Sequence, residues 1–380
     1  IYVGVMTFAT SIITFFSAFM TGNELITLWR VTDSLSIAFR MDYPARAFSC
    51  LVAFIWPLVT LYAFEYLRRR PPVDRFYAFF LSTFGILIGV ACAGNLLTLY
   101  LFYELMTFMT LPLVMHSQKR ESIRATVSYL LYSLTGAAMA LGGFFFFNVY
   151  GVSMDFTPGG VLDMARIVRE NSGDMLLTVT FLTLVGFGAK AGIVPLPAWL
   201  PTAHPQAPTP ASAVLSGLIT KAGVIAMFRV IYYVVGDDFL RGTWVQTALI
   251  CMALLTIFTG SMMAYIEPHL KKRIAWSSVS QVSYVVFAMM LLTLILTGGL
   301  HMDGLMDSFD AIFSRLDTET RLKILDDIHA GSFAVIGCVL ILTAKTLLFA
   351  EIFSQKLNIN FLFSVPIYSR LGMAVLLNNI

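Results

Sequence analysis

Charged residues are scarce in this chain. Asp, Glu, Lys and Arg make up only 12% of its 380 residues, whereas hydrophobic residues make up 58% and the mean hydropathy is +0.80. A soluble domain carries about 25% charged residues, so too little polar surface remains here to face water. The scarcity of charge therefore favours one membrane-embedded bundle over a string of soluble domains.

Cysteine is also scarce, and its spacing argues against disulfide or metal chemistry. Four cysteines lie in apolar stretches without any CxxC pair, and they are Cys50, Cys92, Cys251 and Cys338. This pattern is typical of small buried hydrophobic side chains. No GxGxxG, P-loop, CxxC or haem motif is present in the sequence. Any redox chemistry would therefore belong to partner subunits.

Long apolar runs, by contrast, are abundant. Each is about 20 residues long, which is enough to cross a bilayer. They predict an all-α, polytopic membrane helical bundle of about 10–11 transmembrane helices. We expect helices over residues 1–20, 48–67, 76–93, 96–116, 125–149, 175–200, 211–235, 244–265, 274–297 and 330–354, with a weaker apolar run at 361–378.

Two segments between these runs are predicted to lie outside the bilayer core. Residues 23–47 contain apolar and polar residues in alternation, which indicates extended structure. Residues 160–171 have helical spacing and mixed polarity. They predict a short amphipathic helix at the membrane interface.

Basic residues gather in three of the predicted connections. With the helices above, all three clusters fall on one side of the membrane, and the positive-inside rule makes that side cytoplasmic. We therefore expect an integral, multi-pass protein of a bacterial or archaeal inner (cell) membrane. The clusters are Arg68, Arg69, Arg70 and Arg75; Lys119, Arg120 and Arg124; and Lys271, Lys272 and Arg273.

Three ionisable residues fall well inside predicted helices. Glu104 lies in LLTLYLFYELMTFMTLPLVM, Lys190 in LTLVGFGAKAGIVPLPAWL, and Lys221 in SAVLSGLITKAGVIAMFRV. A charged side chain at mid-bilayer costs about 2.5–3.5 kcal/mol on insertion scales, and such groups usually mark proton or ion paths. We interpret the three residues as a proton path. The alternatives are a purely structural ion pair for the glutamate and snorkelling to the interface for the lysines.

A Glu–Lys contact would give such a path a control point. Burial favours the neutral form of a lysine, whereas a nearby carboxylate favours its charged form. A contact between Glu104 and a lysine that forms and breaks would therefore control the release of a proton from the lysine.

Prolines and histidines near Lys190 add secondary candidates. Pro195 and Pro197 predict a broken helix, because proline removes a backbone donor and broken helices beside an intramembrane charge are a transporter feature. The alternative is an ordinary helix end before the loop HPQAPTP. His204 and His269 lie near loops, where a solvated or capping histidine is the default and a secondary place in the proton path is the alternative.

Three separated stretches resemble one known family. GAKAGIVPLPAWLPTAHPQAPTPASAVLSGLITKAGVIAMFRVIYY is similar to the signature of the antiporter-like membrane subunits of respiratory complex I (NADH dehydrogenase), membrane-bound hydrogenases and Mrp-type cation/proton antiporters. LYLFYELMTF resembles the family's glutamate motif, and LKKRIAWSSVSQVSYVVF resembles a later helix motif. The motifs occur in the family's order over about residues 1–290, and the HPQAPTPASA form resembles the Mrp and hydrogenase branches more than the core complex I subunits.

This resemblance implies a pairing of Glu104 with Lys190 and a lateral proton path that Lys221 continues. It also implies that the partners are membrane lipid and other subunits of a respiratory, hydrogenase or antiporter complex. We expect no nucleic acid partner, and no cofactor in this part of the chain. Family members carry a second broken helix with another lysine or glutamate, which has no match here. We therefore expect residues 1–290 to be an incomplete antiporter-like domain.

An acidic motif follows the antiporter-like part. His301, Asp303, Asp307 and Asp310 form HxDGLxDxxD, and Asp327 lies further along the chain. The three aspartates of the motif fall on one face of a helix. Carboxylates so close repel unless a cation lies among them, and an all-oxygen set suits Mg²⁺. The motif predicts a magnesium site that would hold a substrate phosphate, and the alternative is a solvated acidic loop.

This last part resembles a second family. GGLHMDGLMDSFDAIF and RLKILDDIHAGSF are similar to motifs of the cobalamin-5′-phosphate synthases, also called adenosylcobinamide-GDP ribazoletransferases. The resemblance implies a Mg²⁺-dependent transfer that joins GDP-activated cobinamide to α-ribazole and releases GMP. It implies metal binding by the aspartates, including Asp327, and substrate binding by His301, Lys345 and Arg370. We expect residues 293–380 to be an incomplete membrane segment of this type.

Three hypotheses about function follow. The first is translocation of protons, or exchange of a cation for protons, by a membrane subunit of a complex I-like, hydrogenase-type or Mrp-type assembly. The number and coverage of its motifs favour this hypothesis. The second is a magnesium-dependent ribazoletransferase of cobalamin biosynthesis. The third is an inactive chimera of two truncated membrane proteins. As an enzyme, the chain would be either a translocating subunit of an oxidoreductase complex or the transferase.

Overall fold

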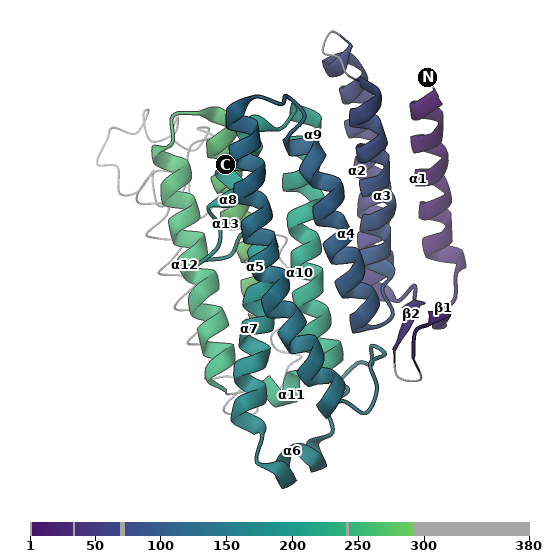
Figure 1. Ribbon diagram of the computed structural model, residues 1–380, viewed down its shortest axis with the longest axis vertical. Helices are drawn as coiled ribbons and strands as arrows, with labels where there is room; N and C mark the ends of the chain where they lie inside the picture. The colour runs from purple at the N-terminus through teal and green to yellow at the C-terminus, as the bar shows by residue number, and fades with distance from the viewer. Residues whose placement is uncertain (1, 33–34, 69–72, 241–242, 292–380) are drawn as a thin grey trace, which may run out of the picture.

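Apolar runs in this chain become helices because a bilayer offers no water to free backbone amides and carbonyls. The computed structural model describes residues 2–32, 35–68, 73–240 and 243–291 (Figure 1). Among them, eight helices are long and apolar enough to cross a membrane. These are α1 (Tyr2–Met20), α2 (Tyr43–Leu67), α3 (Val73–Cys92), α4 (Leu96–Val114), α5 (Arg120–Tyr150), α7 (Gly173–Ala191), the composite helix Thr209–Val235, and α12 (Trp244–Ile266).

The predicted all-α polytopic bundle is confirmed for the described residues. Each helix expected before residue 297 is present, and α13 (Leu270–Leu291) packs along α12 as the last of them. The helices expected over 330–354 and 361–378 lie outside the described residues.

The helix expected over residues 175–200 is interrupted, and its predicted extent is wrong. α7 ends at Ala191, where Gly192 adopts the left-handed conformation with φ of 81°. A new short helix, α8 (Trp199–Gln206), begins after an irregular segment that contains Pro195 and Pro197. The predicted broken helix near Pro195 is therefore confirmed, because these prolines cannot donate backbone hydrogen bonds to continue α7.

The extended segment predicted before α2 is a short hairpin. β1 (Ile26–Arg30) pairs antiparallel with β2 (Ser36–Phe39). Extended structure was expected up to residue 47, but α2 begins directly after Asp42. The Asp42 side chain accepts a hydrogen bond from the backbone N–H of Ala45 at 3.2 Å. This N-cap starts the helix earlier than its apolar run does.

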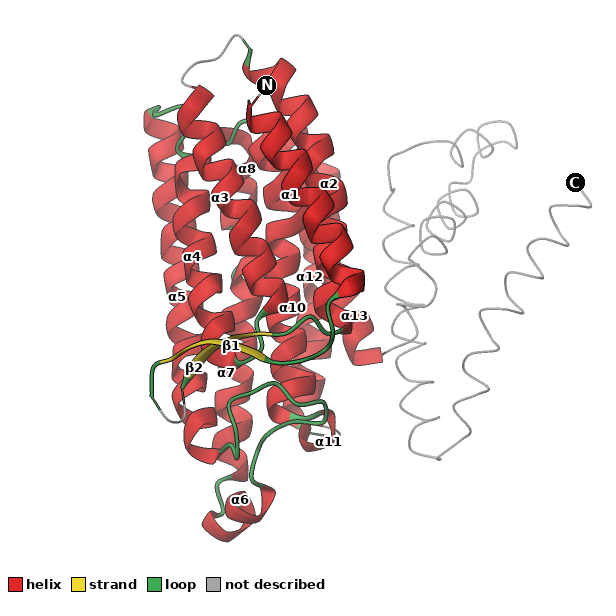
Figure 2. Ribbon diagram, turned by 90° about the vertical axis from the view of Figure 1, so that its right-hand side faces the viewer, coloured by secondary structure: helices red, strands yellow, loops and turns green. Residues whose placement is uncertain are grey.

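The two ends of the bundle differ in charge. Figure 1 places the C-terminal end of α2, the α4–α5 connection and the α12–α13 connection together at one end, here called the basic end. The hairpin, α6 (Met164–Glu170) and α11 (Asp237–Leu240) lie in the opposite half, here called the hairpin end, where the strands run crosswise to the helices (Figure 2). The described members of the three basic clusters therefore share one side, as the charge pattern predicts.

The short helix expected within residues 160–171 is present as α6. Asp163 caps it by accepting a hydrogen bond from the backbone N–H of Arg166. Arg166 Nε donates to Glu170 at 3.0 Å and holds the pKa of that exposed carboxyl below its usual range.

Glycines let the central helices approach closely. A Cβ atom on Gly136 of α5 would lie only 2.5 Å from the carbonyl oxygen of Gly186 on α7. A Cβ atom on Gly223, where the composite helix crosses α7, would lie 2.8 Å from the backbone nitrogen of Ala191. These two crossings pack α5 and the composite helix directly against the half of α7 that carries Lys190.

Candidate functional site

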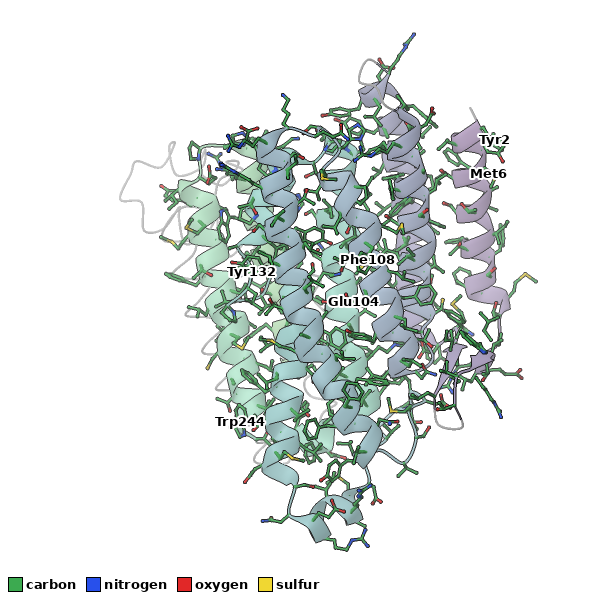
Figure 3. All side chains as sticks on the ribbon, in the orientation of Figure 1. Tyr2, Met6, Glu104, Phe108, Tyr132 and Trp244 are labelled. Carbon is green, nitrogen blue, oxygen red and sulfur yellow. The ribbon has the colours of Figure 1, made fainter. Side chains whose placement is uncertain are left out.

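The three predicted path residues come from neighbouring helices. Glu104 lies at mid-height of the bundle on α4 (Figure 3). Lys190 lies in the last turn of α7, and Lys221 lies in the first turn of α10 (Thr220–Arg229), which belongs to the composite helix. The crossing at Gly223 brings the turn of Lys221 against the end of α7 that holds Lys190.

Lys190 is buried among neutral acceptors. Lys190 is only 1% exposed. Nζ donates to the carbonyl oxygen of Tyr103 at 3.2 Å and to the hydroxyl of Thr107, and it lies 4.2 Å from the centre of the Tyr103 ring. The position at the C-terminal end of α7 also favours a cation, because helix carbonyls point toward it.

Glu104 lies one residue along α4 from Tyr103, but it does not form an ion pair with Lys190. Within the part of the chain that the structure describes, its Oε1 atom is buried without a hydrogen-bond partner, and no ion pair involves its carboxylate. The two charges still influence each other across the gap. The pairing implied by the family resemblance therefore stays a prediction, and the structure shows the two groups separated.

Hydrogen bonds with two side chains fix the irregular segment that follows α7. The indole Nε1 of Trp199 donates to the carbonyl oxygen of Ala189 at 2.8 Å, and the backbone N–H of Val194 donates to the Thr256 hydroxyl at 3.0 Å. Irregular backbone at membrane depth is tolerated where it is buried in protein. These bonds satisfy free groups of the break and fix its position next to Lys190.

Lys221 lies beside a second irregularity. Its Nζ donates at 2.6 Å to the carbonyl oxygen of Ser216, which also accepts the Thr220 hydroxyl at 2.8 Å. Ser216 belongs to η1 (Leu215–Ile219), a π-helical turn that follows α9 (Thr209–Val214). A π-turn widens the helix and frees carbonyl groups, and such turns are frequent at functional sites. The Ser216 hydroxyl in turn bonds the hydroxyl of Ser278 on α13.

The two histidines differ sharply. His204 on α8 is 1% exposed, and its Nδ1 bonds the Ser212 hydroxyl at 2.7 Å. Its Nε2 is buried without a partner among the described residues, and the charges of Lys221 and Lys271 act on the ring. His269 is exposed before α13, where its carbonyl oxygen accepts the backbone N–H of Arg273. The capping interpretation therefore fits His269, while His204 stays a candidate for the path.

Hydroxyl groups continue from Lys190 along α4, and the sequence analysis did not identify them. Thr107 contacts Lys190, and one turn nearer the basic end Thr110 lies 2.7 Å from the hydroxyl of Tyr129. Tyr129 stacks on Trp199 with ring centroids 4.6 Å apart. The three-residue spacing of the threonines after Glu104 was the available signal, since it places them on one helix face.

A buried ion pair was also missed. Arg229 at the end of α10 bonds Asp42 at the start of α2, and both are buried. An arginine inside the apolar run AMFRVIYYVV was a visible signal, because intramembrane charges need partners. Its partner was not visible, since Asp42 lies 187 residues away in the chain.

The predicted magnesium and substrate residues lie outside the described residues. They are His301, Asp303, Asp307, Asp310, Asp327, Lys345 and Arg370.

Two protein families match the sequence. Residues 93–306 match the family described as NADH:quinone oxidoreductase/Mrp antiporter, TM, and this range contains Glu104, Lys190 and Lys221. Residues 240–380 match the family described as cobalamin-5-phosphate synthase. The matched ranges overlap between residues 240 and 306.

Similar proteins come from both respiratory and antiporter complexes. NADH-quinone oxidoreductase subunit N of Desulforudis audaxviator is 31% identical over 256 residues, which cover 66% of this chain and 49% of that protein. Na⁺/H⁺ antiporter subunit A1 of Staphylococcus haemolyticus is 30% identical over 275 residues, covering 71% of this chain and 33% of that protein. The chain thus spans about half or a third of the length of these curated relatives.

The fold is similar to that of a solved membrane complex. A chain of the membrane-bound sulfane sulfur reductase, an archaeal respiratory membrane complex, superposes with a TM-score of 0.64 at 19% identity. The match covers 92% of this chain and 80% of that chain.

Proposed function

Since this chain belongs to the NADH:quinone oxidoreductase/Mrp antiporter family of membrane subunits, we propose that it moves protons, or exchanges a cation for protons, through Glu104, Lys190 and Lys221. It would act as a subunit of a respiratory, hydrogenase-type or Mrp-type complex in the cell membrane of a bacterium or archaeon. The relatives include respiratory and antiporter subunits at similar identity.

One observation carries the proposal: the Lys190 ammonium is buried against neutral acceptors while the nearby Glu104 carboxylate has a free oxygen. The Tyr103 carbonyl and the Thr107 hydroxyl accept hydrogen bonds from the charged amine. Neither acceptor carries a charge that would hold the proton permanently. Lys190 is therefore able to change its protonation state when the position of the Glu104 carboxylate changes.

The proposed mechanism moves the Glu104 carboxylate toward and away from Lys190. In the described residues Glu104 Oε1 has no protein hydrogen bond to break before the carboxylate turns toward Lys190. Its approach favours the charged lysine, and its withdrawal favours release of the proton. The crossing at Gly223 supports Lys221 as the next acceptor, because it packs the first turn of α10 against the end of α7.

Proton flux in vesicles tests this path. The full chain is reconstituted in proteoliposomes, and flux down an imposed pH gradient is followed with an entrapped dye. Lys221→Ala is expected to lower the flux about tenfold or more, by analogy with the loss of a positioned acid–base group. Lys272→Ala removes an exposed lysine of α13 and is expected to leave the flux unchanged. If Lys221→Ala left the flux as high as Lys272→Ala does, Lys221 would not belong to the path.

A second activity is favoured by the match of residues 240–380 to the cobalamin-5-phosphate synthases. It would be the transfer of GDP-activated cobinamide to α-ribazole, with Mg²⁺ held by Asp303, Asp307 and Asp310. The test is GMP release from both substrates with Mg²⁺ present. Asp307→Asn is expected to abolish release while Asp317→Asn, outside the motif, retains it. Absence of GMP release from the unaltered chain would exclude this activity.

A further inference from the structure

Asp42 and Arg229 form a buried ion pair that the proposed path does not use. Arg229 is fully buried, and its two terminal nitrogens bond both carboxylate oxygens of Asp42, one of them at 2.7 Å. One nitrogen also donates to the carbonyl oxygen of Ala91 at 3.2 Å. The rings of Phe156 and Tyr233 lie 5.2 Å and 4.9 Å from the guanidinium carbon.

Stability alone is a weak reason for such a pair. Taking two charges out of water costs as much as their attraction returns in many proteins, and apolar side chains of similar volume often stabilise equally well. In addition, Nε of Arg229 is buried without a hydrogen-bond partner among the described residues. The pair therefore needs an explanation beyond holding α2 and α10 together.

The position of Arg229 along α10 places it on the hairpin side of Lys221. Arg229 lies eight residues after Lys221 on the same helix, a rise of about 12 Å toward the hairpin end. Met227 lies between Lys221 and Arg229 on this helix. A Cβ atom on Gly188, two residues before Lys190, would lie 3.6 Å from the Met227 sulfur. Arg229 is thus the next charged side chain along α10 on the hairpin side of the lysines.

Two cavities are lined by residues that adjoin this group in the sequence, and neither is lined by Asp42 or Arg229. One, of about 440 Å³, is lined by polar residues that include Ser36 and Asp155, the residue before Phe156. The other, of about 400 Å³, is lined by residues that include Met41, which precedes Asp42, and Cys92. Both lie at the hairpin end, and the pair itself is closed to solvent.

We propose that the Asp42–Arg229 ion pair, covered by Phe156 and Tyr233, seals the proton path toward the hairpin end. This inference rests on the proposed function of the lysines. An arginine stays charged at any physiological pH, and a fixed positive charge is a barrier to protons and cations in a narrow pore. Asp42 balances the charge and holds the guanidinium across the route, so transfer to the hairpin side requires the pair to separate.

The labelling rate of the native Cys92 thiol tests this seal. The thiol lies 3.8 Å from the hydroxyl of Ser49 and borders the second cavity. Cys92 directly follows Ala91, whose carbonyl oxygen accepts a hydrogen bond from Arg229. Loss of the pair is therefore expected to change the access of water to this thiol.

The experiment compares labelling and leak in the reconstituted full chain with Cys50, Cys251 and Cys338 replaced by Ala. A water-soluble thiol reagent is expected to label Cys92 at least tenfold faster in the double variant Asp42→Asn/Arg229→Gln. Passive proton leak is expected to rise in parallel. Asn at position 42 still caps α2, because it accepts the Ala45 N–H as Asp does.

A control and a second variant guard against misfolding. Thr83→Val, nine residues before Cys92, removes a hydroxyl of α3 that bonds the Phe79 carbonyl oxygen, and it is expected to change labelling less than twofold. Phe156→Ala uncovers the guanidinium but keeps the pair, and it is expected to raise both labelling and leak. It therefore tests the seal even where the double variant does not fold. Unchanged labelling and leak in folded variants would overturn the seal, even where Lys221→Ala abolishes flux. Faster labelling and leak in the double variant, with flux intact in Lys221→Ala, would keep the pair as a barrier to water and protons and would overturn only the role of Lys221 in the path.

Discussion

Lys190 binds a hydroxyl and a carbonyl instead of a carboxylate, and this choice decides how tightly its proton is held. A direct ion pair would favour the charged amine at all times. The Thr107 hydroxyl and the Tyr103 carbonyl solvate the ammonium without that fixed charge. The proposed control then lies with Glu104, whose Oε1 atom has no hydrogen-bond partner among the described residues.

Removal of the Thr107 hydroxyl tests this arrangement. Thr107→Val keeps the side-chain shape but takes away one acceptor from a buried charged donor, which is expected to cost about 1.5–3 kcal/mol of unfolding free energy. Unfolding in detergent measures the change. Thr135→Val is the matched control, since Thr135 is exposed and, among the described residues, bonds only the Leu131 carbonyl of its own helix. Equal losses in the two variants would show that Thr107 does not support Lys190.

Residues of the site differ in how visible they are in the sequence. Glu104, Lys190 and Lys221 were identifiable because a charge within a long apolar run is conspicuous. The acceptor Thr107 was not, since threonine is ordinary in membrane helices. The Asp42–Arg229 pair joins residues far apart in the chain, and one sequence read by itself carries no signal for such a contact.

At the scale of elements, the helices follow apolar length, whereas their ends follow local hydrogen bonding. The apolar runs therefore predicted the helices of the bundle, and the prolines predicted the break after α7. The ends were less predictable. α2 starts early because Asp42 caps it, and α7 stops early because Gly192 turns its chain. The π-turn beside Lys221 has no sequence signature that apolar spacing reveals.

Close helix crossing gives an element-scale prediction. Gly136→Ala would place a methyl group 2.5 Å from the Gly186 carbonyl oxygen, so α5 and α7 must move apart. We expect a loss of about 1–3 kcal/mol in unfolding free energy, as for other overpacked interiors. Gly142→Ala, on the same helix, meets open space and is expected to stabilise by about 0.5–1 kcal/mol. A stabilised Gly136→Ala protein would contradict the crossing.

At the scale of the molecule, the charge pattern predicts orientation. With Cys50, Cys92, Cys251 and Cys338 replaced by Ala, cysteines are introduced at exposed sites near opposite ends, as Ser117→Cys and Val152→Cys. An impermeant maleimide added to intact cells is expected to label position 152. Position 117, at the basic end, is expected to react only after permeabilisation. The reverse pattern would place the basic end outside.

The chain as a whole joins matches to two families, and the two halves stand differently. The bundle up to residue 291 contains most of the match to the antiporter family, together with Glu104, Lys190 and Lys221. The acidic motif lies beyond the described residues, and the magnesium site proposed for it rests on sequence resemblance and on the family match over 240–380. The proposed function of this molecule therefore rests chiefly on Glu104, Lys190 and Lys221.

Replacement of Glu104 is the most direct test of that claim. Proton flux is measured in proteoliposomes with the full chain, the Glu104→Gln variant and the Glu121→Gln variant, in which an exposed carboxylate of α5 is neutralised as control. We expect Glu104→Gln to lower flux about tenfold or more, while Glu121→Gln matches the unaltered chain. Undiminished flux in Glu104→Gln would contradict a path controlled by this carboxylate.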